Sequence, residues 1–92
     1  ITEKEALQAA EVYLQTEFGL SAEGMTADVF LDEPKTGLFI YHVSYQTEDD
    51  ISIYAYGIDL NAEDGSLVDT SDASIRKDRD SETDKDIDKR IE

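Results

Sequence analysis

His42 is the only histidine of the chain, and imidazole is the side chain best suited to acid–base or metal chemistry near neutral pH. Both uses need partner side chains held at hydrogen-bonding or coordination distance. The residues around His42 give no argument for a serine or aspartate so placed, and the absence of cysteine excludes thiolate nucleophiles, thiolate metal ligands and disulfides. We therefore predict that His42 is structural and that the chain is not an enzyme, with no catalytic residue and no cofactor.

A second group of residues superficially resembles a calcium-binding loop. It comprises Asp59, Asn61, Glu63, Gly65 and Asp69. An EF-hand loop has glycine at its sixth position and glutamate at its twelfth, whereas counting from Asp59 gives Asp64 and Thr70. We interpret these residues as hairpin residues and predict no metal site. The acidic run at 48–50 predicts only weak, nonspecific binding of divalent cations.

Four tyrosines, at positions 41, 45, 54 and 56, could form an aromatic platform for a peptide or a sugar. Their spacing within two candidate strands instead favours a core position, on the side of the sheet that meets a helix. We expect their phenol oxygens to reach the margin of the sheet. The opposite face, around Ile40, His42, Ile53 and Ala55, is the better candidate for a partner, although no single residue is identified as a binding residue.

The charge of the chain is strongly negative, with 23 acidic residues against 8 basic ones and a net charge of −15. Residues 1–70 contain 15 acids and two lysines, a net charge of −13, and residues 71–92 contain 8 acids and 6 bases, a net charge of −2. This charge argues against nucleic acid or anionic lipid as a direct partner and favours a basic one. No segment has the roughly 20 apolar residues of a membrane span. Because the chain starts at Ile1 without a methionine, we expect a signal, an anchor or a larger protein upstream.

The elements that must position these residues fit one small domain. Thr2 and Glu5 form a capping box, and apolar residues at helical spacing follow as far as Phe18, with Gly19 as the expected helix end. Alternating residues from Met25 to Leu31 predict a strand, and residues 32–37, with the only proline, predict a loop.

Two β-hairpins are indicated after residue 37. For the first hairpin we assume a four-residue loop, Thr47 to Asp50, which pairs Tyr45 with Ser52 and Phe39 with Ile58 and places both pairs on the aromatic, helix-facing side. Asp64-Gly65 indicates the second hairpin, whose register remains open. The predicted fold is therefore α+β, with an N-terminal helix packed on a three- to four-stranded antiparallel sheet.

We predict a domain over residues 1–70 and a charged tail or linker over residues 71–92. Large apolar residues in that tail are limited to Ile75, Ile87 and Ile91, too few for a core of its own. A docked helix that places Ile87 and Ile91 on the sheet and an unstructured linker remain open for this segment.

Three segments carry a resemblance to a known family: the capped helix beginning ITEKEALQAA, the strand containing YHV, and the run YAYGIDLNAEDGSLV. The chain resembles a PepSY domain, which typically opens with Ile-(Ser/Thr)-x-x-Glu-Ala and closes with a strand ending in Val/Ile-Asp, a short turn, a glycine and a last apolar strand. The matching residues are Ile1, Thr2, Glu5, Ala6, Tyr41, Val43, Ile58, Asp59, Gly65 and Leu67. The resemblance covers residues 1–70.

This resemblance implies a noncatalytic, bacterial, extracytoplasmic domain that is secreted, held in the cell wall or anchored to a membrane, and that regulates or inhibits a peptidase by binding it. No inhibitory residue is carried over with that implication. The alternative prediction from charge alone is an acidic decoy that imitates nucleic acid and occupies a basic DNA-binding protein. Adaptation of an ordinary domain to high salt is a third hypothesis. The oligomeric state is left open.

Overall fold

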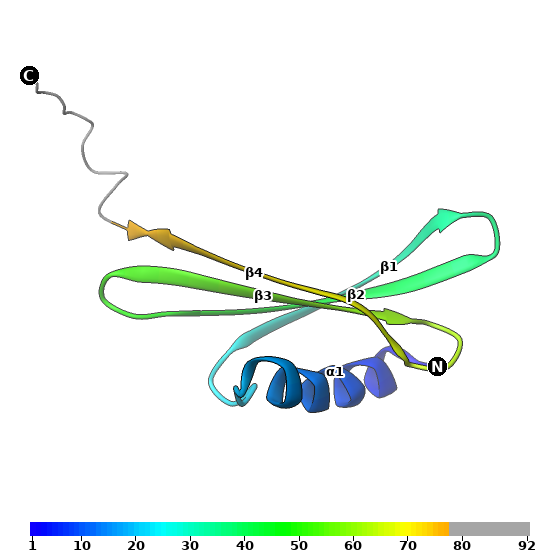
Figure 1. Cartoon of the computed structure of the whole chain (residues 1–92), viewed down its shortest axis with the longest axis horizontal. Helices are drawn as coiled ribbons and strands as arrows, with labels where there is room; N and C mark the ends of the chain where they lie inside the picture. The colour runs from blue at the N-terminus through cyan, green and yellow to red at the C-terminus, as the bar shows by residue number, and fades with distance from the viewer. Residues whose placement is uncertain (78–92) are drawn as a thin grey trace, which may run out of the picture.

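The computed structural model describes residues 1–77 of the chain, so the predictions for Ile87 and Ile91 lie outside the described residues. One helix, α1 (Glu3–Phe18), is followed by four strands, β1 (Thr26–Lys35), β2 (Leu38–Glu48), β3 (Ser52–Asn61) and β4 (Leu67–Arg76). The strands form one antiparallel sheet in the order β1-β2-β3-β4. Figure 1 shows α1 along one face of this twisted sheet. The predicted α+β architecture is confirmed.

Both ends of α1 form where the sequence indicates. The Thr2 hydroxyl accepts from Glu5 N (3.1 Å), and Glu5 Oε1 accepts from Thr2 N (2.9 Å), which is a complete capping box. Gly19 adopts the left-handed conformation (φ 69°), and its N–H donates to Gln15 O. This geometry satisfies carbonyl groups that the end of the helix would otherwise leave unpaired.

The core lies between α1 and the two central strands. Its buried members are Ala6, Ala10 and Leu14 of α1, Tyr41, Val43 and Tyr45 of β2, and Ile58 and Leu60 of β3. The small alanine side chains let the helix approach the sheet closely, and Leu14 is the one large side chain of α1 that is completely buried. Phe18 and Tyr56 extend this core, with ring centroids 5.3 Å apart.

The first hairpin has a different register from the predicted one. Tyr45 pairs with Tyr56 rather than with Ser52, a shift of four residues, because the β2–β3 turn is centred two residues later in the chain than the assumed loop. The Asp49 carboxylate accepts from Ile51 N and Ser52 N, both at 2.8 Å, and Asp49 N donates to Ser52 O, so the turn closes around residues 50 and 51. The shift is an even number of residues, and therefore the predicted assignment of each residue to a face survives.

Three other expectations are corrected. β1 continues to Lys35 through the segment predicted as a loop, because β1 is an edge strand and a register irregularity between Asp32 and Lys35 accommodates the proline. Phe39 lies on the predicted face but extends past the start of α1 and is 45% exposed. β4 runs to Arg76, six residues beyond the position where we placed the end of the domain.

Candidate protein-interaction surface

The face of the sheet opposite α1 is covered by no helix or strand of residues 1–77 (Figure 1). We call this surface the open face. Four rows of cross-strand neighbours make up its centre: Asp32–Ile40–Asn61, Phe30–His42–Asp59–Asp69, Asp28–Ser44–Gly57–Ser71 and Thr26–Gln46–Ala55–Ala73. These rows contain four aspartates and no lysine or arginine, so the centre of the open face is anionic.

His42 lies in the middle of the open face, between two aspartates from the neighbouring strands. Its Nδ1 is 2.7 Å from Asp59 Oδ1 on β3, and its Nε2 is 3.3 Å from Asp32 Oδ2 on β1. Phe30 stacks on the imidazole with ring centroids 5.8 Å apart. Because neutral imidazole has only one N–H donor, both contacts can be hydrogen bonds only when the ring is protonated.

This environment favours the protonated form of His42. The hydrogen bond to Asp59 is the main reason that the pKa of His42 is raised above its ordinary value. Partial burial of the ring opposes that shift, and the hydrogen bond to Asp32 and the charges of both carboxylates add to it. The side chains of His42 and Asp59 are about one-third exposed, at 36% and 31%, so the group remains within reach of a partner.

The chemistry of this trio is that of an ion-pair network. Each ring nitrogen faces a carboxylate, whereas a catalytic triad places a hydroxyl or thiol nucleophile on one side of the imidazole. Within residues 1–77, no group of three or more histidine and acidic side chains is arranged to hold a metal ion. The trio therefore offers carboxylate oxygens and an aromatic stack to a ligand.

Asp59 and Asp69 face each other directly across β3 and β4. Like charges in such a cross-strand pair destabilise a sheet. The Asp59 carboxylate contacts His42, and the Asp69 carboxylate accepts from Thr70 N at 2.9 Å. A cation from a partner would lie between two carboxylates whose mutual repulsion it would relieve.

Small residues form the floor of the open face beside this acidic row. A shallow hollow of about 200 Å³ lies over Gly57 and is bordered by Ser44, Ala55, Ser71 and Ala73. A Cβ atom at position 57 would lie 2.5 Å from Ser71 Oγ, so glycine is the residue that keeps this floor low. The hollow can accept the aliphatic stem of a long side chain, with its charged end near the aspartates.

Two carboxylates of the acidic hairpin tip at 48–50 are held by contacts within the fold. Asp49 caps its own turn and also accepts from Tyr54 Oη at 2.9 Å, and these contacts lower the pKa of its carboxyl group. Glu48 Oε2 accepts from Lys77 Nζ at 2.7 Å. Among the described residues, these two carboxylates already have partners within the fold.

The tyrosines at 41, 45, 54 and 56 all lie on the helix-facing side of the sheet and not on the open face. Tyr41 and Tyr45 are core residues, as predicted, with 7% and 1% exposure. The Tyr41 hydroxyl donates to Ile1 O at 3.0 Å, but Tyr45 Oη is buried without a hydrogen-bond partner among residues 1–77. The expectation that all the phenol oxygens reach the sheet margin is therefore wrong for Tyr45. Burial, with a smaller contribution from the charge of Glu11, raises the pKa of Tyr45 to about 12.

The residues of the supposed calcium loop are divided between a turn and the open face. Asn61 Oδ1 accepts from Glu63 N at 2.8 Å, and Asp64 Oδ1 accepts from Ser66 N at 2.9 Å, both within the β3–β4 turn. Asp59 and Asp69 lie on the strands that this turn connects. Sequence reasoning missed both aspartate partners of His42. The β2–β3 register places Asp59 opposite His42, and the β1–β2 register brings Asp32 within reach from β1.

Comparisons with protein-family models, curated proteins and solved structures find no match to this chain. Within residues 1–77, α1 lacks the length and apolar character that a membrane-spanning helix requires.

Proposed function

We propose that this chain is a noncatalytic, extracytoplasmic protein-interaction domain of the PepSY type, which binds a basic segment of a partner protein through the open face. The resemblance of residues 1–70 to PepSY domains supports the family, the location outside the cytoplasm and a peptidase as partner. The open face supports the mode of binding.

The observation that carries this proposal is the anionic centre of an uncovered sheet face. Asp59 and Asp69 are opposed across two strands, Asp28 and Asp32 lie on the edge strand, and no lysine or arginine occurs in the same rows. Complementary charge on a partner accelerates encounter and fixes the orientation of the complex. The small-residue floor and the Phe30–His42 stack supply contact area that charge alone does not.

Capture from secreted, envelope and cytosolic extracts tests this function. Residues 1–92 are immobilised as the wild type, as the Asp59→Asn/Asp69→Asn variant, and as the Glu17→Gln/Glu23→Gln variant. The last is a matched control, because it makes the same change in charge at exposed positions away from the open face. Captured proteins are identified by mass spectrometry, and the affinity for each is then measured with purified protein at 0.05 M to about 0.3 M salt.

We expect saturable binding of a secreted or envelope protein, a peptidase by the resemblance, that survives moderate salt. The open-face variant should bind about tenfold more weakly and the control about as tightly as the wild type, since each exposed ion pair contributes up to about 1 kcal/mol. Equal loss in both variants, with binding abolished by salt, refutes a shaped interface. If the captured protein is then a cytosolic DNA-binding protein, the acidic decoy replaces this proposal.

A further inference from the structure

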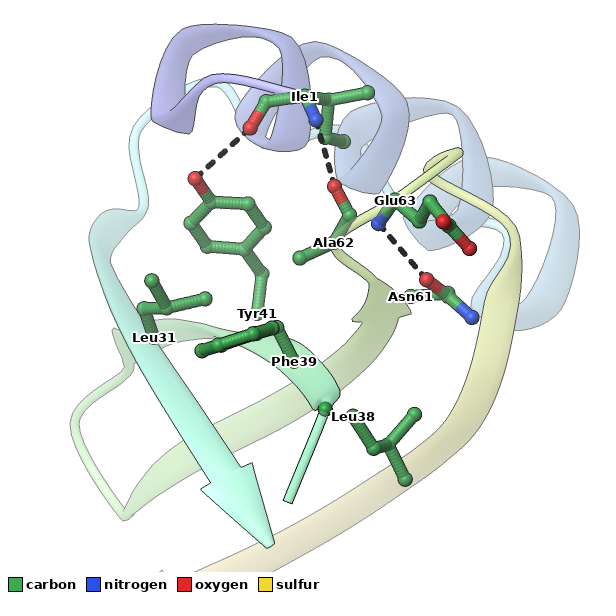
Figure 2. Close-up of a pocket in the computed structure, with 9 residues that line it drawn as sticks. Ile1, Leu31, Leu38, Phe39, Tyr41, Asn61, Ala62 and Glu63 are labelled. Carbon is green, nitrogen blue, oxygen red and sulfur yellow. Dashed lines mark hydrogen bonds between the residues drawn. The ribbon is translucent and has the colours of Figure 1, made fainter. Parts of the chain in front are cut away.

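A second hollow lies at the end of the sheet where α1 begins. We call this hollow the end cavity; its volume is about 420 Å³, within the range of small-ligand sites. Figure 2 shows its lining, which comes from the start of the chain, from β1 and β2, and from the β3–β4 turn. The lining residues are Ile1, Leu31, Gly37, Leu38, Phe39, Tyr41, Asn61, Ala62 and Glu63.

The end cavity exists because α1 is shorter than the strands it covers. Sixteen helical residues extend about 24 Å. The eleven residues of β2 extend about 36 Å. At the end near α1's first turn, the uncovered side chains are apolar: Leu31 is 48% exposed and Phe39 is 45% exposed. Three hydrogen bonds hold the walls of the cavity in place. Ile1 N donates to Ala62 O, Ala62 N donates to Phe39 O, and Tyr41 Oη donates to Ile1 O.

Charge restricts what this cavity can accept. Glu63 is the one charged side chain in its lining. The Ile1 nitrogen already donates to Ala62 O, and the Asn61 amide oxygen already accepts from Glu63 N. An apolar group enters the cavity without leaving a buried charge unpaired. A base next to that group can approach the exposed Glu63 carboxylate.

The end cavity is also accessible from the open face. Leu38 and Phe39 are neighbours on β2 whose side chains belong to opposite faces of the sheet, and yet both line the cavity. Leu38 and His42 are four residues apart on β2, about 13 Å at the rise of a strand. A partner segment of about four extended residues therefore spans the distance from the acidic row to the cavity.

We infer that the end cavity receives a large apolar side chain from the same basic segment that the open face binds. The inference rests on the proposed function and specifies its partner: an apolar anchor such as phenylalanine, a base beside it near Glu63, and a second base four residues from the anchor near Asp59 and Asp69.

Peptide titration of the full chain tests this inference. The probe is acetyl-Lys-Phe-Gly-Ser-Gly-Arg-Gly-amide, and the comparison peptides carry alanine in place of phenylalanine, or glutamate in place of both bases. Binding to ¹⁵N-labelled residues 1–92 is followed by NMR. We expect the phenylalanine probe to bind about tenfold more tightly than the alanine probe, because an aromatic side chain is removed from water. The amides of Gly37, Phe39 and Ala62 should shift, and that of Val12 should not.

Variants separate the cavity from the rest of the surface. Ala62→Leu places a larger side chain in the cavity and should remove the preference for phenylalanine while binding of the alanine probe is retained. Glu63→Gln keeps the shape of the cavity and should lower the affinity for the phenylalanine probe about threefold. Ile51→Ala, an exposed apolar change outside the cavity lining, should preserve the preference. Circular dichroism of each variant confirms that it is folded.

Equal affinity of the phenylalanine and alanine probes for the wild type overturns the inference. If those equal affinities still fall in Asp59→Asn/Asp69→Asn, the proposed function stands without its anchor. If the phenylalanine preference is present but Asp59→Asn/Asp69→Asn changes neither probe, the cavity binds its anchor and the proposed function of the open face fails.

Discussion

Replacing Leu14 by alanine should undock α1 from the sheet more effectively than any other single truncation in the helix. Leu14 is completely buried, and the other buried positions of α1, Ala6 and Ala10, are already alanine. Leu7, Tyr13 and Phe18 of α1 also pack against this core but are only partly buried. Truncating Leu14 therefore removes the one large side chain of the helix that is completely buried.

The cost of Leu14→Ala follows from two contributions. Removing three buried carbons costs about 2.5 kcal/mol at roughly 0.8 kcal/mol for each methylene. The space left behind costs about 1 kcal/mol more, because a packed core relaxes only in part. We expect the free energy of unfolding to fall by about 3.5 kcal/mol, which is a large fraction of the roughly 5–14 kcal/mol typical for a domain of this size.

Urea denaturation followed by circular dichroism measures this loss, with the slope of the transition checked for a change. Val12→Ala is the matched control on the same helix, because Val12 is 61% exposed, and its effect should stay within about 0.5 kcal/mol. A loss below about 1.5 kcal/mol for Leu14→Ala would refute the reasoning, since it would mean that α1 is not held to the sheet by this contact.

Four further predictions concern the open face and the core. Asp59→Asn should lower the pKa of His42 toward its ordinary value, as followed by NMR of the imidazole protons, because the contact with Asp59 is the largest cause of the raised pKa. Because the pKa of His42 is raised in the folded state, His42 stabilises the fold fully below pH 6.5, the pKa of an unperturbed histidine. This stabilisation is lost as the pH rises through the raised pKa. The urea midpoint of the wild type should therefore fall between pH 6 and 8, and His42→Gln should remove that fall. Gly57→Ala should leave the free energy of unfolding within about 1 kcal/mol of the wild-type value, because the Ser71 hydroxyl can rotate away and the unfolded chain loses entropy. The same substitution should weaken partner binding, because the added methyl group raises the floor of the open face. Tyr45→Phe should raise stability by about 1 kcal/mol in thermal or urea unfolding, because it removes a buried hydroxyl that has no described partner.

The predictions for Asp59→Asn, Gly57→Ala and Tyr45→Phe each have a result that contradicts them. An unchanged His42 pKa in Asp59→Asn would mean that the 2.7 Å contact does not persist in solution. A loss of more than about 2 kcal/mol in Gly57→Ala would show that Ser71 cannot move. A loss of similar size in Tyr45→Phe would reveal a hydrogen bond to the phenol that the fold of residues 1–77 does not contain.

The local elements of the fold were predictable because their signals lie within a few residues. The capping box at Thr2 and the left-handed Gly19 define α1, and both form as the spacing indicates. The alternation of apolar residues in β2 and β3 assigns each side chain to a face. This assignment is insensitive to a register error of an even number of residues, and for that reason the predicted core face is right although the pairing is shifted.

The candidate surface was less predictable because it depends on pairing between strands. His42 and Asp59 are 17 residues apart, and only the register of β2 against β3 brings them together. The decisive signal is Asp49, whose carboxylate accepts from Ile51 N and Ser52 N and so places the turn at residues 50 and 51. The end cavity depends on the difference in length between α1 and β2 and on the β3–β4 turn, whose register the sequence left open.

The order of the sheet also determines how the chain folds. Each strand pairs with the strand next to it in sequence, so the sheet can grow hairpin by hairpin, with short loops to close at each step. Within residues 1–77, the contacts that span much of the chain come from Ile1 and α1: Ile1 N donates to Ala62 O, and Leu14 packs in one core with Ile58 and Leu60. During synthesis the helix leaves the ribosome before the strands, but its binding surface is complete only after β3 has emerged. We therefore expect docking of α1 to be the late, rate-limiting step of folding, and the sheet to form without waiting for it.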